Sequence, residues 1–367
     1  MKYNWQLSDW ANFSYDESVI DSFVLKFAIE IGELTGLASA LTKTNQQEAY
    51  LQLMIAEALK TSEIEGEIFS REDLLSSIKK KLGYHKEVGK IRDKKAQGIA
   101  SLMVYISENF HEKLSEKSIK EWHKTLMEVE PYVNPGNYRK SEEPMQVVSG
   151  AYGKEVVHYE APPSEIVPNE MKNFVKWYNS FVANTDDIRK ILIKTALSHL
   201  YFESIHPFED GNGRIGRALA EKCLSESFNR SLFVSISTVI EKDKKRYYNA
   251  LKKAQKSLEV TDWLRYFSEV ITEGVKHSKL LIGWTVNKMK FLDKYRSEMN
   301  ERQLKAVLKM FDVGYTGFEG GMTARKYVSI NKTSRATATR DLQELVTKNI
   351  FTQNGEGRNV SYQLNIL

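Results

Sequence analysis

The residues with the clearest chemical potential form one run of twelve, HPFEDGNGRIGR, from His206 to Arg217. Glycines allow backbone N–H groups to converge, and the N-terminus of a following helix adds positive potential. The stretch 211–213 therefore predicts an anion nest suited to phosphates. Arg214 precedes Arg217 by three residues, so both can flank the nest from the first turn of that helix. Two fixed guanidiniums suit a polyphosphate.

Two further side chains of the run complete a set for transfer chemistry. Asp210 is a hard oxygen ligand, suited to a Mg²⁺ ion that bridges phosphates. His206 titrates near neutrality and could accept the proton of an incoming hydroxyl. Each feature alone is more common in a plain loop or on a solvated helix face. Their concentration in one short run indicates nucleotidyl or phosphoryl transfer without a Walker lysine.

The run matches the Fic family motif H-x-F-x-D/E-G-N-G/K-R-x-x-R at every defined position, and the chain resembles Fic proteins over residues 110–270. The resemblance implies a mainly helical enzyme that transfers AMP from ATP to a Ser, Thr or Tyr hydroxyl of a target protein and releases pyrophosphate. It also implies that His206 is the general base, Phe208 a buried anchor and Asp210 the Mg²⁺ ligand. The ATP contacts that it implies are Gly211, Asn212, Gly213, Arg214, Ile215, Gly216 and Arg217, with Tyr247, Tyr248 and Gln255 of the downstream segment RYYNALKKAQ on the nucleoside side.

A second motif lies upstream. Thr61 to Gly66 reads TSEIEG and resembles the inhibitory motif S/T-x-x-x-E-G/N of Fic proteins whose inhibitory helix precedes the core. The resemblance implies that Glu65, supported by Thr61 and Gly66, pairs with Arg217. A carboxylate there would take the partner of the γ-phosphate and repel the phosphate itself. The alternative is an ordinary helix C-terminus, with Gly66 just past the helix and Glu65 exposed.

The elements that must position these residues are mostly helices. Apolar residues recur at helical spacing in 48–60 and 187–203, and the stretches 213–228, 245–257 and 262–278 also indicate helices, so the expected fold class is mainly α. One β-hairpin interrupts them, where the runs 146–148 and 155–159 flank a turn at 150–153. The Fic resemblance makes this hairpin the flap that aligns a target segment; the alternative is a plain connecting hairpin. The implied docking residues are Gln146, Val147, Val148, Val156 and Val157.

The last 67 residues hold most of the excess positive charge, with ten Lys and Arg against six Asp and Glu, in a chain whose net charge is only +5. Three expected helices near 304–311, 323–329 and 333–348 precede a hairpin of 350–353 and 360–364 around the turn 354–357. This order resembles a winged helix-turn-helix. Its third helix offers Arg335, Thr337 and Arg340 for DNA contacts. A winged helix used only for protein contacts, or a solvated basic surface, stays open as an alternative.

These expectations give a domain order: an N-terminal helical cap with the inhibitory helix over 1–85, the catalytic core over 110–270, a helical linker over 271–299 and the winged helix-like domain over 300–367. The lone Cys223 excludes an internal disulfide and a cysteine-based zinc cluster. The N-terminal sequence shows no apolar signal segment, so a cytoplasmic protein without membrane contact is expected.

Three rival functions stay open. Some Fic relatives transfer phosphocholine or UMP, or phosphorylate; Gly213 argues against the phosphorylating relatives, which carry Lys at that position. Removal of AMP, with Glu65 positioning a water, is the second rival. A DNA-binding regulator that senses nucleotide is the third. The expected cofactor is Mg²⁺. The expected partners are ATP, a target protein, the chain itself through auto-AMPylation, DNA, and a second copy in a homodimer.

Overall fold

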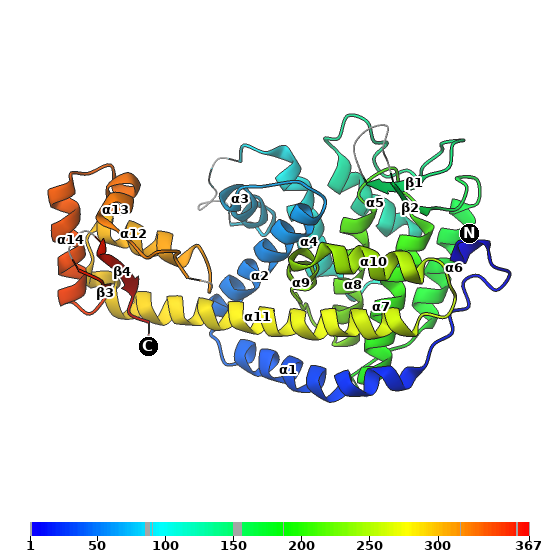
Figure 1. Cartoon of the computed structure of the whole chain (residues 1–367), viewed down its shortest axis with the longest axis horizontal. Helices are drawn as coiled ribbons and strands as arrows, with labels where there is room; N and C mark the ends of the chain where they lie inside the picture. The colour runs from blue at the N-terminus through cyan, green and yellow to red at the C-terminus, as the bar shows by residue number, and fades with distance from the viewer. Residues whose placement is uncertain are drawn as a thin grey trace. The chain divides into compact units, whose positions relative to one another are not determined.

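The computed structural model describes residues 2–84, 89, 91–149, 156–185, 187–315, 317–356 and 359–366. These residues form mostly α-helices joined by loops, together with two antiparallel sheets of two strands each (Figure 1). The mainly α fold expected from the periodicity is therefore confirmed. The helices are α1 (Asp21–Ser39), α2 (Lys43–Ile64), α3 (Arg71–Lys81), α4 (Lys94–Asn109), α5 (Glu116–Met127), α6 (Val167–Ser180), α7 (Ile188–Ile205), α8 (Asn212–Ser227), α9 (Ile236–Lys242), α10 (Lys244–Ala254), α11 (Thr261–Tyr295), α12 (Glu301–Phe311), α13 (Ala324–Asn331) and α14 (Arg335–Thr347).

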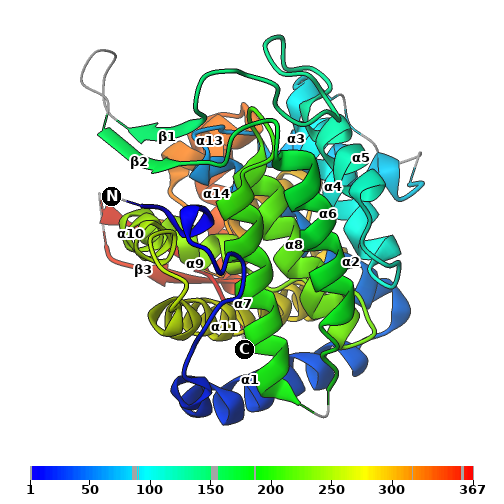
Figure 2. The same cartoon turned by 90° about the vertical axis from the view of Figure 1, so that its right-hand side faces the viewer.

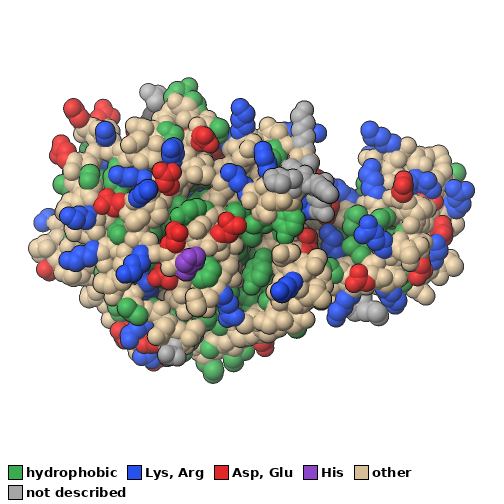
Figure 3. All heavy atoms as spheres, turned by 180° about the vertical axis from the view of Figure 1, so that it is seen from behind, with side chains coloured by type: hydrophobic (Ala, Val, Ile, Leu, Met, Phe, Trp, Pro, Cys, Tyr) green, Lys and Arg blue, Asp and Glu red, His purple; other side chains and the backbone are tan. Residues whose placement is uncertain are grey.

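The chain divides into two compact units. The first unit contains residues 1–35 and 53–278, and the second contains 36–52 and 279–367. The expected domain ranges 1–85, 110–270, 271–299 and 300–367 stay predictions. On the face drawn in Figure 3, Lys and Arg side chains are interspersed with Asp and Glu over the larger unit, as its near-neutral composition requires.

Helices α7 and α8 form the centre of the first unit. Every residue of α7 from Ile191 to Ile205 is buried, and almost all of α8 is buried as well. A helix that is covered on all sides lacks a polar stripe, which is why polar residues inside α7 and α8 need partners from other elements. Helix α6 lies along α7, and α7 lies along α8 (Figure 2). The twelve-residue run covers the loop between α7 and α8 and the first six residues of α8.

The structure contains helices at all five stretches expected in residues 48–278, but the ends of these helices differ from the expected ones. Helix α10 stops at Ala254, three residues before the expected end. Helix α11 continues to Tyr295 instead of ending near 278, because Ile282, Phe291 and Tyr295 extend its buried face and no proline interrupts it.

The predicted flap is an antiparallel hairpin of β1 (Gln146–Ser149) and β2 (Val156–Glu160). Gln146 lies opposite Glu160 and Val147 opposite Tyr159, and the register shifts between Val147 and Val148. The expected turn at 150–153, Glu155, and the side chains of Val148 and Val156 lie outside the described residues.

The second unit contains α12, α13, α14 and the hairpin of β3 (Phe351–Asn354) and β4 (Ser361–Leu364), in the order that the sequence predicts. Gly357 of its expected turn lies outside the described residues. Apolar side chains from these elements and from the end of α11 share one core. Its fully buried members include Ala306, Val307, Tyr327, Ala338, Leu342, Leu345 and Ile350.

Candidate active site

The loop from α7 to α8 begins with a residue in an uncommon conformation. His206 ends α7 with φ 49° and ψ 60°, in the left-handed region, and its backbone N–H donates to the carbonyl of Phe202 (2.9 Å). Helix α8 starts at Asn212, preceded by Gly211 at φ 80°. Non-glycine residues rarely adopt positive φ and cluster at functional sites when they do.

Asn212 closes this loop with its side chain. Its Oδ1 accepts from the Phe208 backbone N–H (3.0 Å), and its Nδ2 donates to the Phe208 carbonyl (2.8 Å). Phe208 is fully buried and stacks on His123 of α5, with ring centroids 3.9 Å apart. The expected buried anchor is therefore observed. The Asn212 side chain is thus held within the loop, and the backbone N–H of Asn212 faces the start of the helix without an acceptor in it.

The imidazole of His123 holds the loop through hydrogen bonds. Its Nδ1 accepts from the Gly136 N–H (2.9 Å), so the ring hydrogen lies on Nε2, 3.2 Å from the Asp210 carbonyl. Burial lowers the pKa of His123 to about 4, which keeps this tautomer neutral. The backbone that carries the candidate nest is thus fixed by a buried ring.

The N-terminus of α8 lies where the anion nest is expected, and its binding of an anion stays a prediction. The N–H groups of its first turn, residues 212–214, have no acceptor within the helix. A Cβ placed on Gly213 would lie 2.3 Å from Glu65 Oε1 and 3.1 Å from Arg217 Nη1. Glycine is required for this close approach, and a carboxylate oxygen of Glu65 lies beside the place where an anion would bind.

Arg217 is the centre of the contact between α8 and the end of α2. The residue is only 1% exposed, its Nε donates to Thr61 Oγ1 (2.7 Å), and its Nη2 donates to the Thr61 carbonyl (2.9 Å) and to Glu65 Oε1 (2.7 Å). Glu65 raises the pKa of Arg217 against the opposing effect of burial, so the guanidinium is charged. The structure therefore brings Glu65, Thr61 and Arg217 together.

The end of α2 explains how Glu65 reaches this position. The Glu67 N–H donates to the Ser62 carbonyl (3.0 Å) and the Gly66 N–H to the Glu63 carbonyl (3.2 Å), with Gly66 at φ 83°. This is the Schellman arrangement of a helix C-terminus. The plain-terminus alternative is thus right about Gly66, but Glu65 is ion-paired, with 28% of its side chain exposed.

Arg214 has a partner that the sequence reasoning missed. Its Nη1 forms an ion pair with Glu67 Oε2, and its Nη2 lies 3.6 Å from Asp210 Oδ2. Glu67 also lies 3.4 Å from Lys95 Nζ. The signal was available in part, because Glu65 and Glu67 are two carboxylates upstream of two arginines. Both arginines of the run therefore face carboxylates from one short segment.

His206 is neutral in this environment. Its side chain is 15% exposed, and its Nδ1 lies 3.8 Å from Glu203 Oε2. Burial, followed by the charge of Arg139, lowers the pKa of His206 to about 4. A neutral imidazole whose Nδ1 side faces the protein has Nε2 available as a base.

A polar network lies beneath the loop. Glu203 is buried, burial raises its pKa to about 8, and among the described residues its Oε1 has no hydrogen-bond partner. The Gln255 side chain donates to the Glu203 carbonyl (3.1 Å), and the Tyr247 hydroxyl lies 2.9 Å from His199 Nε2. Tyr247 and Gln255 are thus interior, whereas Tyr248 is 41% exposed. Their role on the nucleoside side stays a prediction.

Ile215 and Gly216 lie inside α8. Ile215 is fully buried, and a Cβ on Gly216 would lie 2.4 Å from Glu203 Oε1. Both residues therefore pack inside the first unit, and their contacts with ATP stay predictions.

Asp210 fits the expected ion in part. Its side chain is 58% exposed beside the nest, and its Oδ1 accepts from the Gly211 N–H (2.5 Å). The described residues contain no group of three or more His, Cys, Asp or Glu arranged to hold a metal. One open carboxylate next to a phosphate nest suits Mg²⁺, which keeps several waters and takes its remaining oxygens from phosphates.

The flap is fixed to the end of α7. The Tyr159 hydroxyl donates to the Ser204 carbonyl (2.6 Å), and the N-terminal Trp5 indole donates to the Glu160 carbonyl (2.8 Å). Asn4, fully buried, donates through its side chain to Ser204 Oγ (3.0 Å). Val157 is 40% exposed, and Gln146 is exposed too. The N-terminal residues and the flap therefore meet at one point beside the loop.

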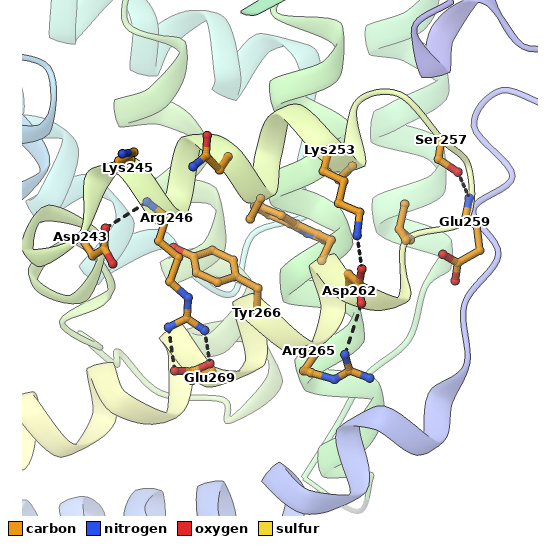
Figure 4. A pocket seen from close by; sticks show the side chains of 15 residues that line it. Asp243, Lys245, Arg246, Lys253, Ser257, Glu259, Asp262, Arg265, Tyr266 and Glu269 are labelled. Atoms are coloured by element: carbon orange, nitrogen blue, oxygen red, sulfur yellow. Dashed lines mark hydrogen bonds and ion pairs between the residues drawn. The ribbon is translucent and has the colours of Figure 1, made fainter.

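A separate cavity of about 690 Å³ lies between α10 and the start of α11 (Figure 4). Three of the four basic side chains in its lining are paired with acidic ones: Arg246 with Glu269 through two hydrogen bonds, and Lys253 and Arg265 with Asp262. The lining also contains Lys245, Asp243 and Glu259, so it has as many acidic as basic side chains and offers no clear preference for an anionic ligand.

In the second unit, α14 exposes Arg335 and Arg340, whereas the Thr337 N–H donates to the capping Ser334 Oγ (3.1 Å). Buried Asp341 of α14 pairs with Arg302 (2.8 Å). No helix within the described ranges is both long and apolar enough to cross a membrane.

Comparison with known families agrees with this geometry. Residues 113–224 match the Fic/DOC family model, and residues 3–84 match a domain of unknown function, DUF4172. Over 121 residues, 33% of this chain, the sequence is 34% identical to a protein of Aquifex aeolicus (strain VF5) named as a probable protein adenylyltransferase. The match covers only 31% of that relative's length.

Solved structures show the same fold. A Fic family protein from Desulfovibrio desulfuricans G20 matches with a TM-score of 0.57 at 18% identity, over 96% of this chain and 97% of that one. A Fic domain-containing signaling protein from Bacteroides thetaiotaomicron VPI-5482 matches with a TM-score of 0.52 at 21% identity, over 70% and 97%. At such identities the likeness establishes the fold alone. Together with the family match and the motif, it identifies residues 113–224 as a domain of the Fic/DOC family.

Proposed function

We propose that this chain is a protein adenylyltransferase that transfers AMP from ATP to a Ser, Thr or Tyr hydroxyl of a target protein, and to itself. One observation carries the proposal. A neutral His206 precedes an anion nest flanked by two buried arginines, Arg214 and Arg217, at the loop from α7 to α8. The name of the Aquifex relative supports AMP as the transferred group.

In the proposed reaction the phosphates of ATP replace the carboxylates now on the arginines. The first-turn N–H groups of α8, Arg214 and Arg217 bind the polyphosphate chain. Asp210 would hold Mg²⁺, which supplies charge neutralisation on the phosphates when bound. The target hydroxyl oxygen bonds to the α-phosphorus while His206 Nε2 takes its proton. The bond from the α-phosphorus to the bridging oxygen breaks, and pyrophosphate leaves.

The same proposal includes autoinhibition. Glu65 holds Arg217 and places its carboxylate oxygen beside Gly213, so it competes with a phosphate for both. Like charges at such distances repel strongly in a partly buried site. The resting chain is therefore expected to bind ATP poorly or in a misaligned way.

The test is transfer by purified protein with Mg²⁺ and ATP, followed by intact mass. Wild type, Glu65→Gly and Glu65→Gly/His206→Ala proteins are compared. We expect one or more AMP adducts in Glu65→Gly and their loss in the double variant. Adducts in the double variant would contradict the role of His206. Loss of AMP from the modified protein on addition of wild type would instead support removal of AMP with Glu65 positioning a water.

A second candidate function is DNA binding by the second unit. Arg335 and Arg340 lie exposed on α14, which follows α13 as the second helix of the expected helix-turn-helix. Fluorescence anisotropy with duplex DNA at two salt concentrations tests it. A tight, strongly salt-dependent complex that Arg335→Ala/Arg340→Ala weakens would support the candidate, and equal weak binding by both proteins would exclude it.

A further inference from the structure

Arg139 is a buried guanidinium that binds backbone carbonyls and a hydroxyl. It lies between α5 and β1 and is 2% exposed. Its Nε donates to the His206 carbonyl (2.8 Å), its Nη2 to the Pro162 carbonyl (2.5 Å) and its Nη1 to Ser164 Oγ (3.1 Å). Its own backbone N–H donates to the Pro207 carbonyl (3.0 Å). A charge this deeply buried is retained only when its donors are satisfied.

The acceptors of Arg139 belong to two different parts of the site. His206, the candidate base, caps the end of α7, and Pro207 follows it in the loop. Pro162 and Ser164 follow β2, and Ser164 Oγ donates in turn to the Ser141 carbonyl (2.8 Å), just before β1. The guanidinium of Arg139 therefore links the segments before β1 and after β2 to the backbone of His206.

The backbone of His206 has a conformation that its neighbours must stabilise. His206 has φ 49°, which is unfavourable for a side chain with a Cβ and persists only where the surroundings impose it. Arg139 binds the carbonyl of that same residue and, through its own N–H, the carbonyl of the next one. The direction of the imidazole follows from this backbone conformation.

We propose that Arg139 is a positioning residue that holds His206 at a fixed distance and angle from the flap. A target hydroxyl aligned on the flap then lies within proton-transfer reach of the imidazole. This inference rests on the proposed function, since it concerns the same reaction. It assigns no contact with ATP to Arg139.

The charge of Arg139 has a second consequence for the base. The groups that act on His206 are Arg139 from the segment before β1, the backbone of Glu203 from α7, and Asp210 from the loop. Burial and the charge of Arg139 lower the pKa of the imidazole, whereas the other two raise it. Removing the positive charge at position 139 should raise the His206 pKa, whereas replacing the guanidinium of Arg139 with the ammonium group of lysine should not.

The test compares Arg139→Met and Arg139→Lys, both in the Glu65→Gly background. The matched control is Arg189→Met, at the opposite end of α7, where a partly exposed guanidinium pairs with Asp21. We expect auto-modification to fall about 100-fold in Arg139→Met and about 10-fold in Arg139→Lys, because small misplacements of a reacting group cost such factors. ATP affinity should change less than about twofold in either, because no phosphate contact is lost.

A second readout separates positioning from general structural damage. The histidine NMR signal that disappears in His206→Ala is titrated in each variant. The His206 pKa should rise in Arg139→Met, stay low in Arg139→Lys and not change in the control. Hydrogen exchange of the β1 and β2 amides should accelerate in both Arg139 variants.

Several results would overturn the inference. Unchanged rates in both variants would do so, as would a loss of ATP affinity parallel to the loss of rate. If Arg139→Met does not fold, Arg139→Lys decides alone: a full rate with unchanged flap exchange overturns the inference. If the Glu65→Gly parent transfers no AMP, the proposed function fails instead. The His206 pKa and the flap exchange then decide about Arg139, and no change in either refutes it.

Discussion

Replacing Glu65 by glycine is the sharpest perturbation that the structure offers. It removes one carboxylate from Arg217 but leaves the two hydrogen bonds from that guanidinium to Thr61. Position 65 follows the end of α2 at Ile64, so glycine interrupts no helix. Arg217 should therefore stay in place with one side open to a phosphate.

The size of the effect follows from the contact that is lost. A hydrogen bond of 2.7 Å between Arg217 and a carboxylate with 28% exposure is charged at both ends. Such bonds contribute about 1.5–3 kcal/mol. A value near 2 kcal/mol corresponds to about a 30-fold change in an equilibrium constant. We expect auto-modification to rise about 30-fold in Glu65→Gly.

The assay is a time course of AMP incorporation by intact mass, with two companions. Glu65→Gln keeps the size of the side chain and a weaker hydrogen bond without the charge, so its rate should lie between wild type and Glu65→Gly. Glu63→Gly is the matched control. Glu63 lies two positions before Glu65, and its carboxylate pairs with Lys60 (2.5 Å) instead of Arg217. It should behave as wild type.

Two outcomes would refute this reasoning. If Glu65→Gly and Glu63→Gly raise the rate equally, loosening of the end of α2 is the cause rather than release of Arg217. If wild type and Glu65→Gly bind ATP with equal affinity and transfer at equal rates, the carboxylate does not compete with a phosphate. Thermal melting of each variant shows that the comparison is between folded proteins.

Three further predictions concern neighbouring groups. Glu67→Gln in the Glu65→Gly background should tighten ATP binding by up to about tenfold by releasing Arg214, measured calorimetrically; unchanged affinity would leave Glu67 without a regulatory part. Gly216→Ala should lower the unfolding free energy by about 1–3 kcal/mol through overlap with Glu203 Oε1, and Glu203→Ala should restore most of the loss in thermal denaturation. Because burial raises the Glu203 pKa to about 8, the folded state retains a proton that the unfolded chain loses near its ordinary pKa. Stability should then fall as pH rises from about 4.5 to 8, and Glu203→Gln should flatten that slope in chemical denaturation.

The sequence was most informative where the candidate site residues are close together in the chain. The nest, the two arginines and His206 lie in one run, so their meeting required only that α7 and α8 flank the loop. Helical periodicity indicated both helices, because their apolar spacing is regular even though they are buried on all sides. Glu65 was linked to Arg217 by a family resemblance, not by periodicity.

Pairings between distant segments were not accessible in this way. Glu67 and Arg214 are 147 residues apart, and Arg139 binds His206 across 67 residues. Arg139 lies in an irregular segment without a repeating pattern, so nothing local marks it as buried. The position of Gln255 near the nucleoside stays a prediction, but the hydrogen bond from its side chain to the Glu203 carbonyl could not be inferred from spacing. Spacing defines a helix face, but only tertiary packing determines its neighbour.

In the proposed autoinhibition, residues 65–67 could be released without movement of α2. Glu57, in the middle of α2, is buried and accepts hydrogen bonds from the Ser237 N–H (3.2 Å) and hydroxyl at the start of α9. Moving the whole helix would break these bonds and leave a buried carboxyl without partners. Residues 65–67 are instead held by the turn at Gly66 and by partly exposed ion pairs. We therefore expect that displacing residues 65–67 alone costs the least free energy, so that in the proposed mechanism ATP would compete with two carboxylates rather than with a helix.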